Sequence, residues 1–117
     1  LFVGDTSTKT ADLDASCDTS GMPKNGAPEV IYKLELTKTS RVLIDLAGSA
    51  FTGIVSLRKG TTCPGTEVPG ACSAGYFIDN AFLDVTVDAG TYWVVVDGYS
   101  LASGAYRLDV RVAPPKT

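Results

Sequence analysis

Three cysteines, Cys17, Cys63 and Cys72, are the residues of this chain with the most specific chemistry. Cys63 and Cys72 are nine positions apart and enclose two turn-forming pairs, Pro64-Gly65 and Pro69-Gly70. A disulfide that closes a loop of this size stabilises a fold by roughly 2.5–3 kcal/mol. We therefore predict a Cys63–Cys72 disulfide and, with it, an oxidising compartment, so that the protein is secreted or lies at the cell surface.

Cys17 then has no obvious partner within the chain. A leftover cysteine is a buried inert thiol, a free surface thiol or one half of an intermolecular bridge, and the sequence leaves these three alternatives open. A structural zinc site is not expected, because three cysteines without histidine leave a tetrahedral ligand set incomplete.

Histidine is absent from the sequence. Its absence excludes Ser-His-Asp and Cys-His arrangements and removes the usual general base near neutral pH. The acidic residues of the predicted strands fall on polar, alternating faces, where solvation accounts for them. We therefore predict that the protein is not an enzyme and that it needs no cofactor.

One predicted strand carries apolar side chains on both faces. Trp93 and Val95 alternate with Tyr92, Val94 and Val96. In a sandwich, either a loop covers the second face or an apolar patch is exposed there. The aromatic residues that could join Trp93 in such a patch are Tyr76, Phe77, Phe82 and Tyr99. Aromatic platforms bind sugar rings and protein hot spots. We predict a binding surface for a polysaccharide or an extracellular protein, formed by Trp93, Val95, Tyr99, Tyr76 and Phe77.

Strict alternation of apolar and polar residues is the dominant pattern of the chain. It predicts three strands near the C-terminus, at Phe82–Val87, Thr91–Val96 and Ala105–Val112. Earlier strands are predicted at Val30–Thr37, Arg41–Leu46 and Gly53–Arg58, and a long loop at 59–76. Helical periodicity is not evident. Such a series of short strands predicts an all-β fold, an antiparallel jelly-roll-like β-sandwich of about seven or eight strands.

The length of 117 residues suits one domain. We assign residues 1–112 to a single β-sandwich domain, in which residues 1–16 form an edge strand or an N-terminal arm. Residues 113–117 contain two adjacent prolines and are predicted to be a Pro-rich linker or tail. The chain starts without methionine, and we expect a processed product or a domain of a longer protein.

Composition limits the range of partners. The net charge is −3, with both signs dispersed along the sequence, which argues against nucleic acid. No stretch approaches the roughly 20 apolar residues of a membrane-spanning helix, so we expect no membrane insertion.

Several ordered motifs together resemble the bacterial pre-peptidase C-terminal domain family, in the form found in large secreted and surface proteins of myxobacteria-like organisms. The resemblance extends from near Asp14 to Val112. Its motifs are Ala27–Leu34, Ser40–Val42, Phe51–Leu57, the Cys63 to Cys72 loop, Asp88–Gly98 and Ser103–Leu108. The resemblance implies a jelly-roll β-sandwich without catalytic activity, appended to secreted proteases and surface proteins.

The same resemblance carries two further expectations. Related domains often place a cysteine before a Gly-Ser pair, where this chain has Leu46–Ser49, so the resemblance implies that Cys17 has lost its partner. Some relatives bind calcium through N-terminal acidic residues. The matching candidates here are Asp5, Asp12, Asp14 and Asp18, because calcium requires several clustered oxygens.

These observations predict a non-catalytic extracellular module for binding, adhesion or an accessory role in a secreted or cell-surface bacterial protein. The alternative is a self-assembling structural subunit of an extracellular filament, tube or surface layer. In that case copies of the chain would join by strand addition at a sheet edge, with Cys17 bridging them.

Overall fold

The computed structural model describes residues 1–7, 9, 16–17, 28–75, 80–99 and 102–115. These residues form eight β-strands, and no helix among them is long and apolar enough to cross a membrane. The strands are β1 (Phe2–Asp5), β2 (Val30–Leu36), β3 (Ser40–Asp45), β4 (Gly53–Lys59), β5 (Thr66–Ala74), β6 (Phe82–Val87), β7 (Gly90–Gly98) and β8 (Ala105–Ala113). The all-β prediction is confirmed.

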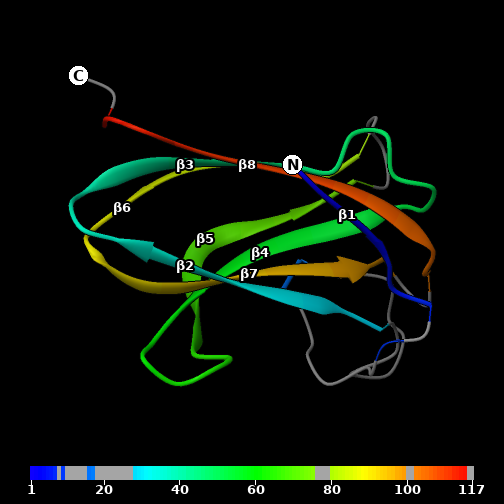
Figure 1. Cartoon of the computed structure of the whole chain (residues 1–117), viewed down its shortest axis with the longest axis horizontal. Helices are drawn as coiled ribbons and strands as arrows, with labels where there is room; N and C mark the ends of the chain where they lie inside the picture. Colours follow the sequence, from blue (N-terminus) through cyan, green and yellow to red (C-terminus); the bar gives the residue numbers. More distant parts are fainter. Residues whose placement is uncertain (8, 10–15, 18–27, 76–79, 100–101, 116–117) are drawn as a thin grey trace.

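Two antiparallel four-stranded sheets pack face to face (Figure 1). One has the order β1-β8-β3-β6 and is called the β8 sheet; the other has the order β2-β7-β4-β5 and is called the β7 sheet. Every connection except β4–β5 passes from one sheet to the other. The three C-terminal strands therefore do not pair with one another: β6 and β8 flank β3, while β7 lies in the opposite sheet. The predicted sandwich is confirmed.

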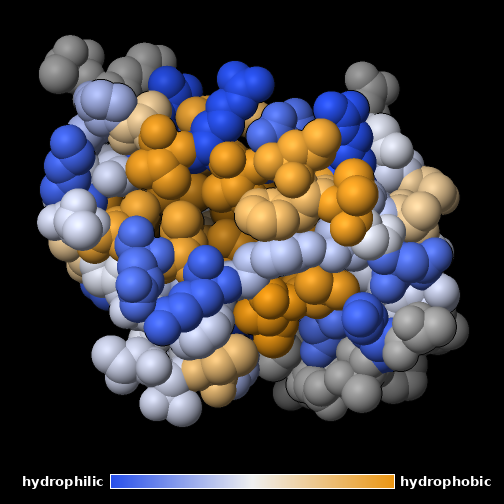
Figure 2. Space-filling view, in the orientation of Figure 1, coloured by the Kyte–Doolittle hydropathy of each residue, from blue (hydrophilic) through white to orange (hydrophobic). Residues whose placement is uncertain are grey.

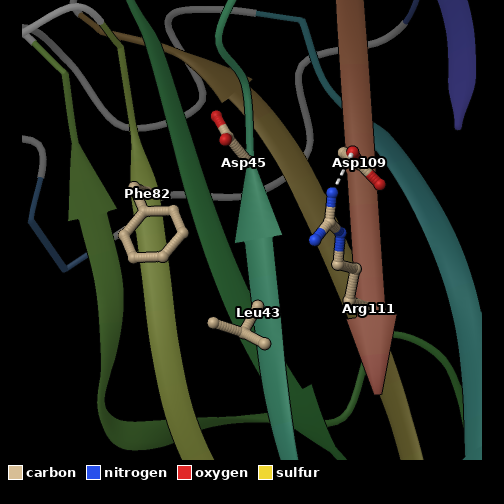
Figure 3. Close-up of a pocket in the computed structure, with 5 residues that line it drawn as sticks. All are labelled: Leu43, Asp45, Phe82, Asp109 and Arg111. Carbon is tan, nitrogen blue, oxygen red and sulfur yellow. Dashed lines mark ion pairs between the residues drawn. The ribbon is translucent and has the colours of Figure 1, made fainter. Parts of the chain in front are cut away.

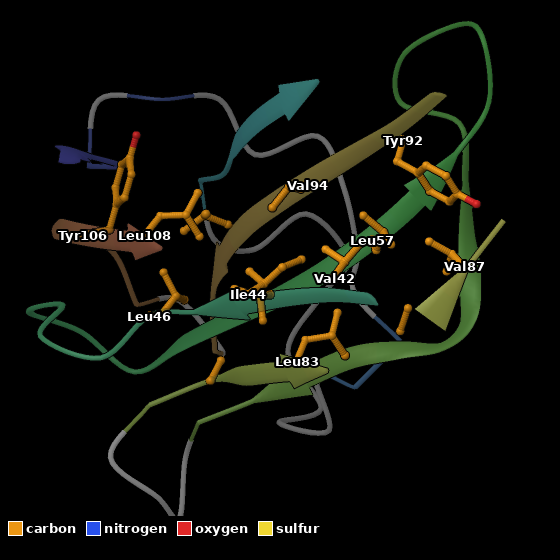
Figure 4. Close-up of a cluster of buried hydrophobic side chains, with 14 of the residues drawn as sticks. Val42, Ile44, Leu46, Leu57, Leu83, Val87, Tyr92, Val94, Tyr106 and Leu108 are labelled. Carbon is orange, nitrogen blue, oxygen red and sulfur yellow. The ribbon is translucent and has the colours of Figure 1, made fainter. Parts of the chain in front are cut away.

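Alternate residues of each strand fill the space between the sheets (Figure 4). Val42 and Ile44 of β3 are fully buried, and so are Leu57 of β4 and Leu108 of β8. Each fully buried aliphatic side chain contributes about 1.5–3 kcal/mol relative to an exposed one. Because successive side chains of a strand point to opposite faces, this core also decides which residues point outward.

The long loop predicted at 59–76 is wrong, because most of it forms strand β5. Pro69 and Gly70 lie inside this strand, where they were expected to mark a turn. β5 pairs only with β4 and is therefore an edge strand, which tolerates a proline without an N–H group. The register with β4 shifts between Ser56 and Arg58, and Gly70 has a φ of 77°. The two residues thus mark an irregularity within an edge strand.

The short strand β1 borders β8, within the range predicted as an edge strand or arm. Its Phe2 ring lies 4.6 Å from the ring of Tyr32 in the opposite sheet, and the hydroxyl groups of Tyr32 and Tyr106 are hydrogen-bonded. Burial, together with this hydrogen bond, raises the pKa of the Tyr32 hydroxyl above its ordinary value. Gly4 is required beside this pair, because a Cβ atom there would lie 2.6 Å from the Tyr106 hydroxyl oxygen. The C-terminal strand β8 ends at Ala113, and Pro114 and Pro115 follow it outside the sheet.

Asn80 lies in the connection between β5 and β6 and binds the backbone at the start of β4. Its Oδ1 accepts hydrogen bonds from the backbone N–H groups of Gly53 and Ala81, at 3.0 and 2.9 Å. Its Nδ2 donates to the carbonyl of Phe51 at 3.0 Å. The side chain is buried, so each of these backbone groups depends on it for a partner.

We expect Asn80→Ala to lower the free energy of unfolding by at least about 2 kcal/mol, because it leaves buried backbone groups without partners. Denaturant unfolding followed by fluorescence measures this loss. The exposed variant Thr86→Ala, on the outer face of β6, is the control and should stay within about 0.5 kcal/mol of the unmodified protein. Equal stabilities of the two variants would contradict the role of Asn80.

Candidate functional site

A shallow groove of about 270 Å³ lies on the outer face of the β8 sheet (Figure 3). We call it the Phe82 groove; its lining residues are Leu43, Asp45, Phe82, Asp109 and Arg111. They come from three neighbouring strands, β3, β6 and β8. Each of them points outward because its sequence neighbours, among them Ile44, Leu83 and Leu108, point into the core.

Strand register places these side chains in two rows. In the first row Asp45 lies between Phe82 on β6 and Asp109 on β8. In the second row Leu43 has Arg111 as its partner on β8. The Phe82 ring stands at the rim with 48% of its surface exposed. The groove thus combines one exposed aromatic ring, an aliphatic floor, two carboxylates and one guanidinium group.

The ion pair beside the groove is much closer than the ion pair inside it. Arg41 and Asp84, just outside it, form a two-fold hydrogen-bonded ion pair with distances of 2.8 and 2.6 Å, and this carboxylate raises the pKa of the guanidinium. Inside the groove Arg111 approaches Asp109 only to 3.8 Å. The facing positions of Asp45 and Asp109 on neighbouring strands bring like charges together, which is unfavourable. A ligand that donates hydrogen bonds to both carboxylates would relieve this repulsion.

Asp45 is partly committed to the backbone, since its Oδ1 accepts a hydrogen bond from the N–H of Ala47 at 2.7 Å. This bond fixes the side chain at the end of β3, and in Figure 3 the carboxylate points to the upper left, away from Asp109. A preset carboxylate beside an exposed ring is suited to reversible binding of a ligand with an apolar face and polar edges.

The surface predicted around Trp93 lies on the other side of the molecule, on the outer face of the β7 sheet. Trp93 is half-buried, its Nε1 donates to the Gly60 carbonyl at 2.8 Å, and the Lys33 ammonium lies 5.8 Å from its ring centroid. Phe82 belongs to the opposite sheet, so the expectation that it could join Trp93 in one patch is wrong. The sequence pointed to Phe82 as a candidate binding residue, but it did not point to the other residues that line the Phe82 groove.

Val95 is 2% exposed, and Ile54 and Ser56 beside it on the same face are buried as well. The sequence left open whether this face is covered or exposes an apolar patch. The half of the face around Val95 is covered, so Val95 offers no surface to a partner. Tyr99 is partly buried, and its backbone N–H donates to Thr52. The two remaining members of the predicted surface, Tyr76 and Phe77, lie outside the described residues.

The disulfide joins Cys17 to Cys72, and Cys63 is a free exposed cysteine. Both the predicted Cys63–Cys72 bond and the unpaired state of Cys17 are therefore wrong. The reason is strand β5: Cys72 lies opposite Ser56 in the middle of the ladder, whereas Cys63 lies in the turn that joins β4 to β5. The seven residues from Thr66 to Cys72 span about 20 Å of strand, whereas a disulfide requires Cα atoms within about 7 Å.

The acidic residues proposed for calcium are not brought together by the described part of the chain. Asp12, Asp14 and Asp18 lie outside it. The carboxylate of Asp5 accepts hydrogen bonds from the side chain and the backbone N–H of Ser7, which lower its pKa. Among the described residues no group of three or more metal-ligating side chains occurs. Calcium binding remains a prediction.

We expect alkylation of the native, non-reduced protein to modify only Cys63, and alkylation after reduction and unfolding to modify all three cysteines; intact mass measures both. Cys72→Ser should lower the free energy of unfolding by up to ~4 kcal/mol, because the bond closes a loop with a sequence separation of 55 residues. Cys63→Ser is the control and should change stability little. A native protein that resists alkylation at Cys63 would contradict the assignment.

No family model matches the sequence, and none of the curated proteins compared with it matches. Among solved structures, the chain is similar to the 1.0 Å crystal structure of the pre-peptidase C-terminal domain of collagenase from Bacillus anthracis. The identity is 12% and the TM-score 0.51, and the alignment covers 94% of this chain and 86% of that chain. At this identity the likeness shows a shared fold, the β-sandwich that the sequence resemblance implied.

Proposed function

We propose that the chain is a non-catalytic binding module of a secreted or cell-surface bacterial protein, and that the Phe82 groove binds a polysaccharide. The observation that carries this proposal is the exposed Phe82 ring beside the carboxylates of Asp45 and Asp109. A pyranose ring presents an apolar face, which stacks on an aromatic ring, and hydroxyl groups at its edge.

The charges of the groove narrow the class of sugar. Its two carboxylates accept hydrogen bonds from hydroxyl or ammonium groups, and Arg111 donates to a ring or hydroxyl oxygen. Two acidic groups against one basic group disfavour uronic acids and sulfated sugars. The ligand that fits is a neutral or amino-sugar polymer. The groove is open on the sheet surface, so a long chain can pass through it.

Three observations support the extracellular and non-catalytic parts of the proposal. The Cys17–Cys72 disulfide is typical of proteins outside the cytosol. The fold is similar to that of the pre-peptidase C-terminal domain of a collagenase. The sequence contains no histidine, which removes the commonest acid–base catalyst.

We expect Phe82→Ala to weaken binding to a neutral or amino-sugar polymer by about tenfold, because it removes the stacking platform from an exposed position without disturbing the core. The ligand is first selected on an array of purified glycans, and affinity is then measured by titration calorimetry. Val3→Ala, exposed on the outer face of β1, is the matched control and should bind normally.

A second variant separates this groove from the surface around Trp93. If Trp93→Ala abolishes glycan binding in a folded protein while Phe82→Ala does not, the Phe82 groove is not the site. If no glycan binds and collagen does, the polysaccharide part of the proposal fails.

Calcium is proposed only from the family resemblance, with Asp5, Asp12, Asp14 and Asp18 as its candidate ligands. We expect millimolar calcium to raise the melting temperature and an excess of chelator to reverse the rise, because an ion that binds only the folded state stabilises it. Differential scanning calorimetry measures both. The variant Asp14→Asn should reduce the shift, whereas Asp88→Asn, in the turn after β6, is the control. An identical melting temperature with and without calcium would rule the ion out.

A further inference from the structure

The outer face of the β8 sheet carries charges of both signs. In the space-filling view, hydrophilic side chains stand along the upper rim of the molecule, where β3 and β8 run (Figure 2). A carboxylate that is already hydrogen-bonded to a guanidinium group has less charge and fewer lone pairs to offer a ligand. What this face binds therefore depends on which of its charges have a partner. The outward charged residues of β3, β6 and β8 are Arg41, Asp45, Asp84, Arg107, Asp109 and Arg111.

Two of the three carboxylates on this face have an arginine partner. Asp84 forms the two-fold ion pair with Arg41, and the Asp109 carboxylate lies 3.8 Å from the guanidinium group of Arg111. Asp45 forms no ion pair within the described part of the chain. The Phe82 groove therefore contains one carboxylate whose negative charge is not balanced by a neighbouring cation.

The remaining cation of this face, Arg107, lies outside the groove lining. Its side chain runs beside Gly48, where a Cβ atom would lie 3.3 Å from the arginine Cδ. The Asp45 carboxylate points away from Asp109, to the side of β3 on which the Phe82 ring stands (Figure 3). The unbalanced charge is thus directed to the aromatic side of the groove.

One ligand unit can contact the Phe82 ring and the Asp45 carboxylate together. The two residues are direct cross-strand partners, and side chains in such positions have Cβ atoms about 4.5–5.5 Å apart. The face of a pyranose unit stacks on the aromatic ring, while an amino group at its edge reaches the carboxylate. The face of the aromatic ring also attracts an ammonium group. An ammonium group therefore interacts favourably with both side chains, whereas a hydroxyl group gains only a hydrogen bond.

We propose that the Phe82 groove selects an amino sugar with a free ammonium group, and that Asp45 is the residue that distinguishes it from the N-acetylated sugar. This inference rests on the proposed function and narrows its ligand class. Acetylation converts the ammonium group into a neutral amide, which keeps one N–H donor but loses the ionic part of the interaction. The paired charges of Asp109 and Arg111 offer an acceptor and a donor together, which suits the hydroxyl groups of the next sugar unit.

A lysine-rich polypeptide also carries ammonium groups, but the groove suits it less well. The stem of a lysine side chain is flexible and has no flat face to stack on the Phe82 ring, and holding it in one conformation costs entropy. A pyranose unit presents its ring face, its ammonium group and its hydroxyl groups on one rigid frame. The occupant is therefore an amino-sugar polymer, and a lysine peptide serves as a comparison in the test.

The test compares a tetramer of β-1,4-linked glucosamine with its fully N-acetylated form, by titration calorimetry at a slightly acidic pH that keeps the amines protonated. We expect the free amine to bind about tenfold more tightly, and about 1 M sodium chloride to reduce this preference because salt screens the ion pair. Asp45→Asn should remove the preference, since asparagine keeps an acceptor for the Ala47 N–H but not the charge. Glu35→Gln, exposed on the opposite sheet, changes the net charge equally and should preserve it.

The outcomes separate this inference from the proposed function. If both tetramers bind equally and Phe82→Ala weakens both, the groove binds polysaccharide without selecting the amine, and the inference alone fails. A preference that survives Asp45→Asn in a protein shown by circular dichroism to be folded also overturns it. If neither tetramer binds, the inference fails, and the glycan array decides the proposed function separately. A lysine tetrapeptide that binds as tightly as the glucosamine tetramer would overturn the inference, because the site would then bind any ammonium group.

Discussion

Burial of alternate side chains between two facing sheets is the constraint on which the rest of this structure depends. Ile44 and Leu108 point inward from neighbouring strands, and a strand allows only two directions for its side chains. Once these residues are buried, Asp45 and Asp109 must point outward. The Phe82 groove is thus a consequence of core packing: its polar and aromatic groups are held in place by aliphatic neighbours that never touch a ligand.

Different contacts hold the two sheets together at the two long sides of the sandwich. At one side β5 approaches β6, and Asn80, in the connection between these strands, satisfies backbone groups at Phe51 and Gly53. At the other side the contact depends on the short strand β1 and on the aromatic pair of Phe2 and Tyr32. The two long sides of the sandwich are therefore held together by different contacts: a buried amide at one side and an aromatic pair at the other.

The outer face of the β7 sheet shows how a face that is apolar in sequence becomes part of the interior. Ile54 and Val95 are buried there, and the Cys17–Cys72 disulfide holds the chain at Cys17 against the neighbouring strand β5. Trp93, farther along β7, directs its indole N–H to the Gly60 carbonyl. The aromatic and apolar residues that suggested a binding platform thus largely serve packing, whereas the ring that is most exposed among the described aromatic residues of the strand faces is Phe82.

The sequence by itself determined the fold class, the bounds of most strands and the inward residues of each, because alternation with period two is a local property. It could not determine strand order. The partners of Asp45 are Phe82 and Asp109, far from it in the sequence, and only the sheet register makes them neighbours. The same holds for Cys17 and Cys72, and for β5, whose proline is compatible with a strand only at a sheet edge. These features were decided by tertiary structure, since they depend on which strands lie side by side.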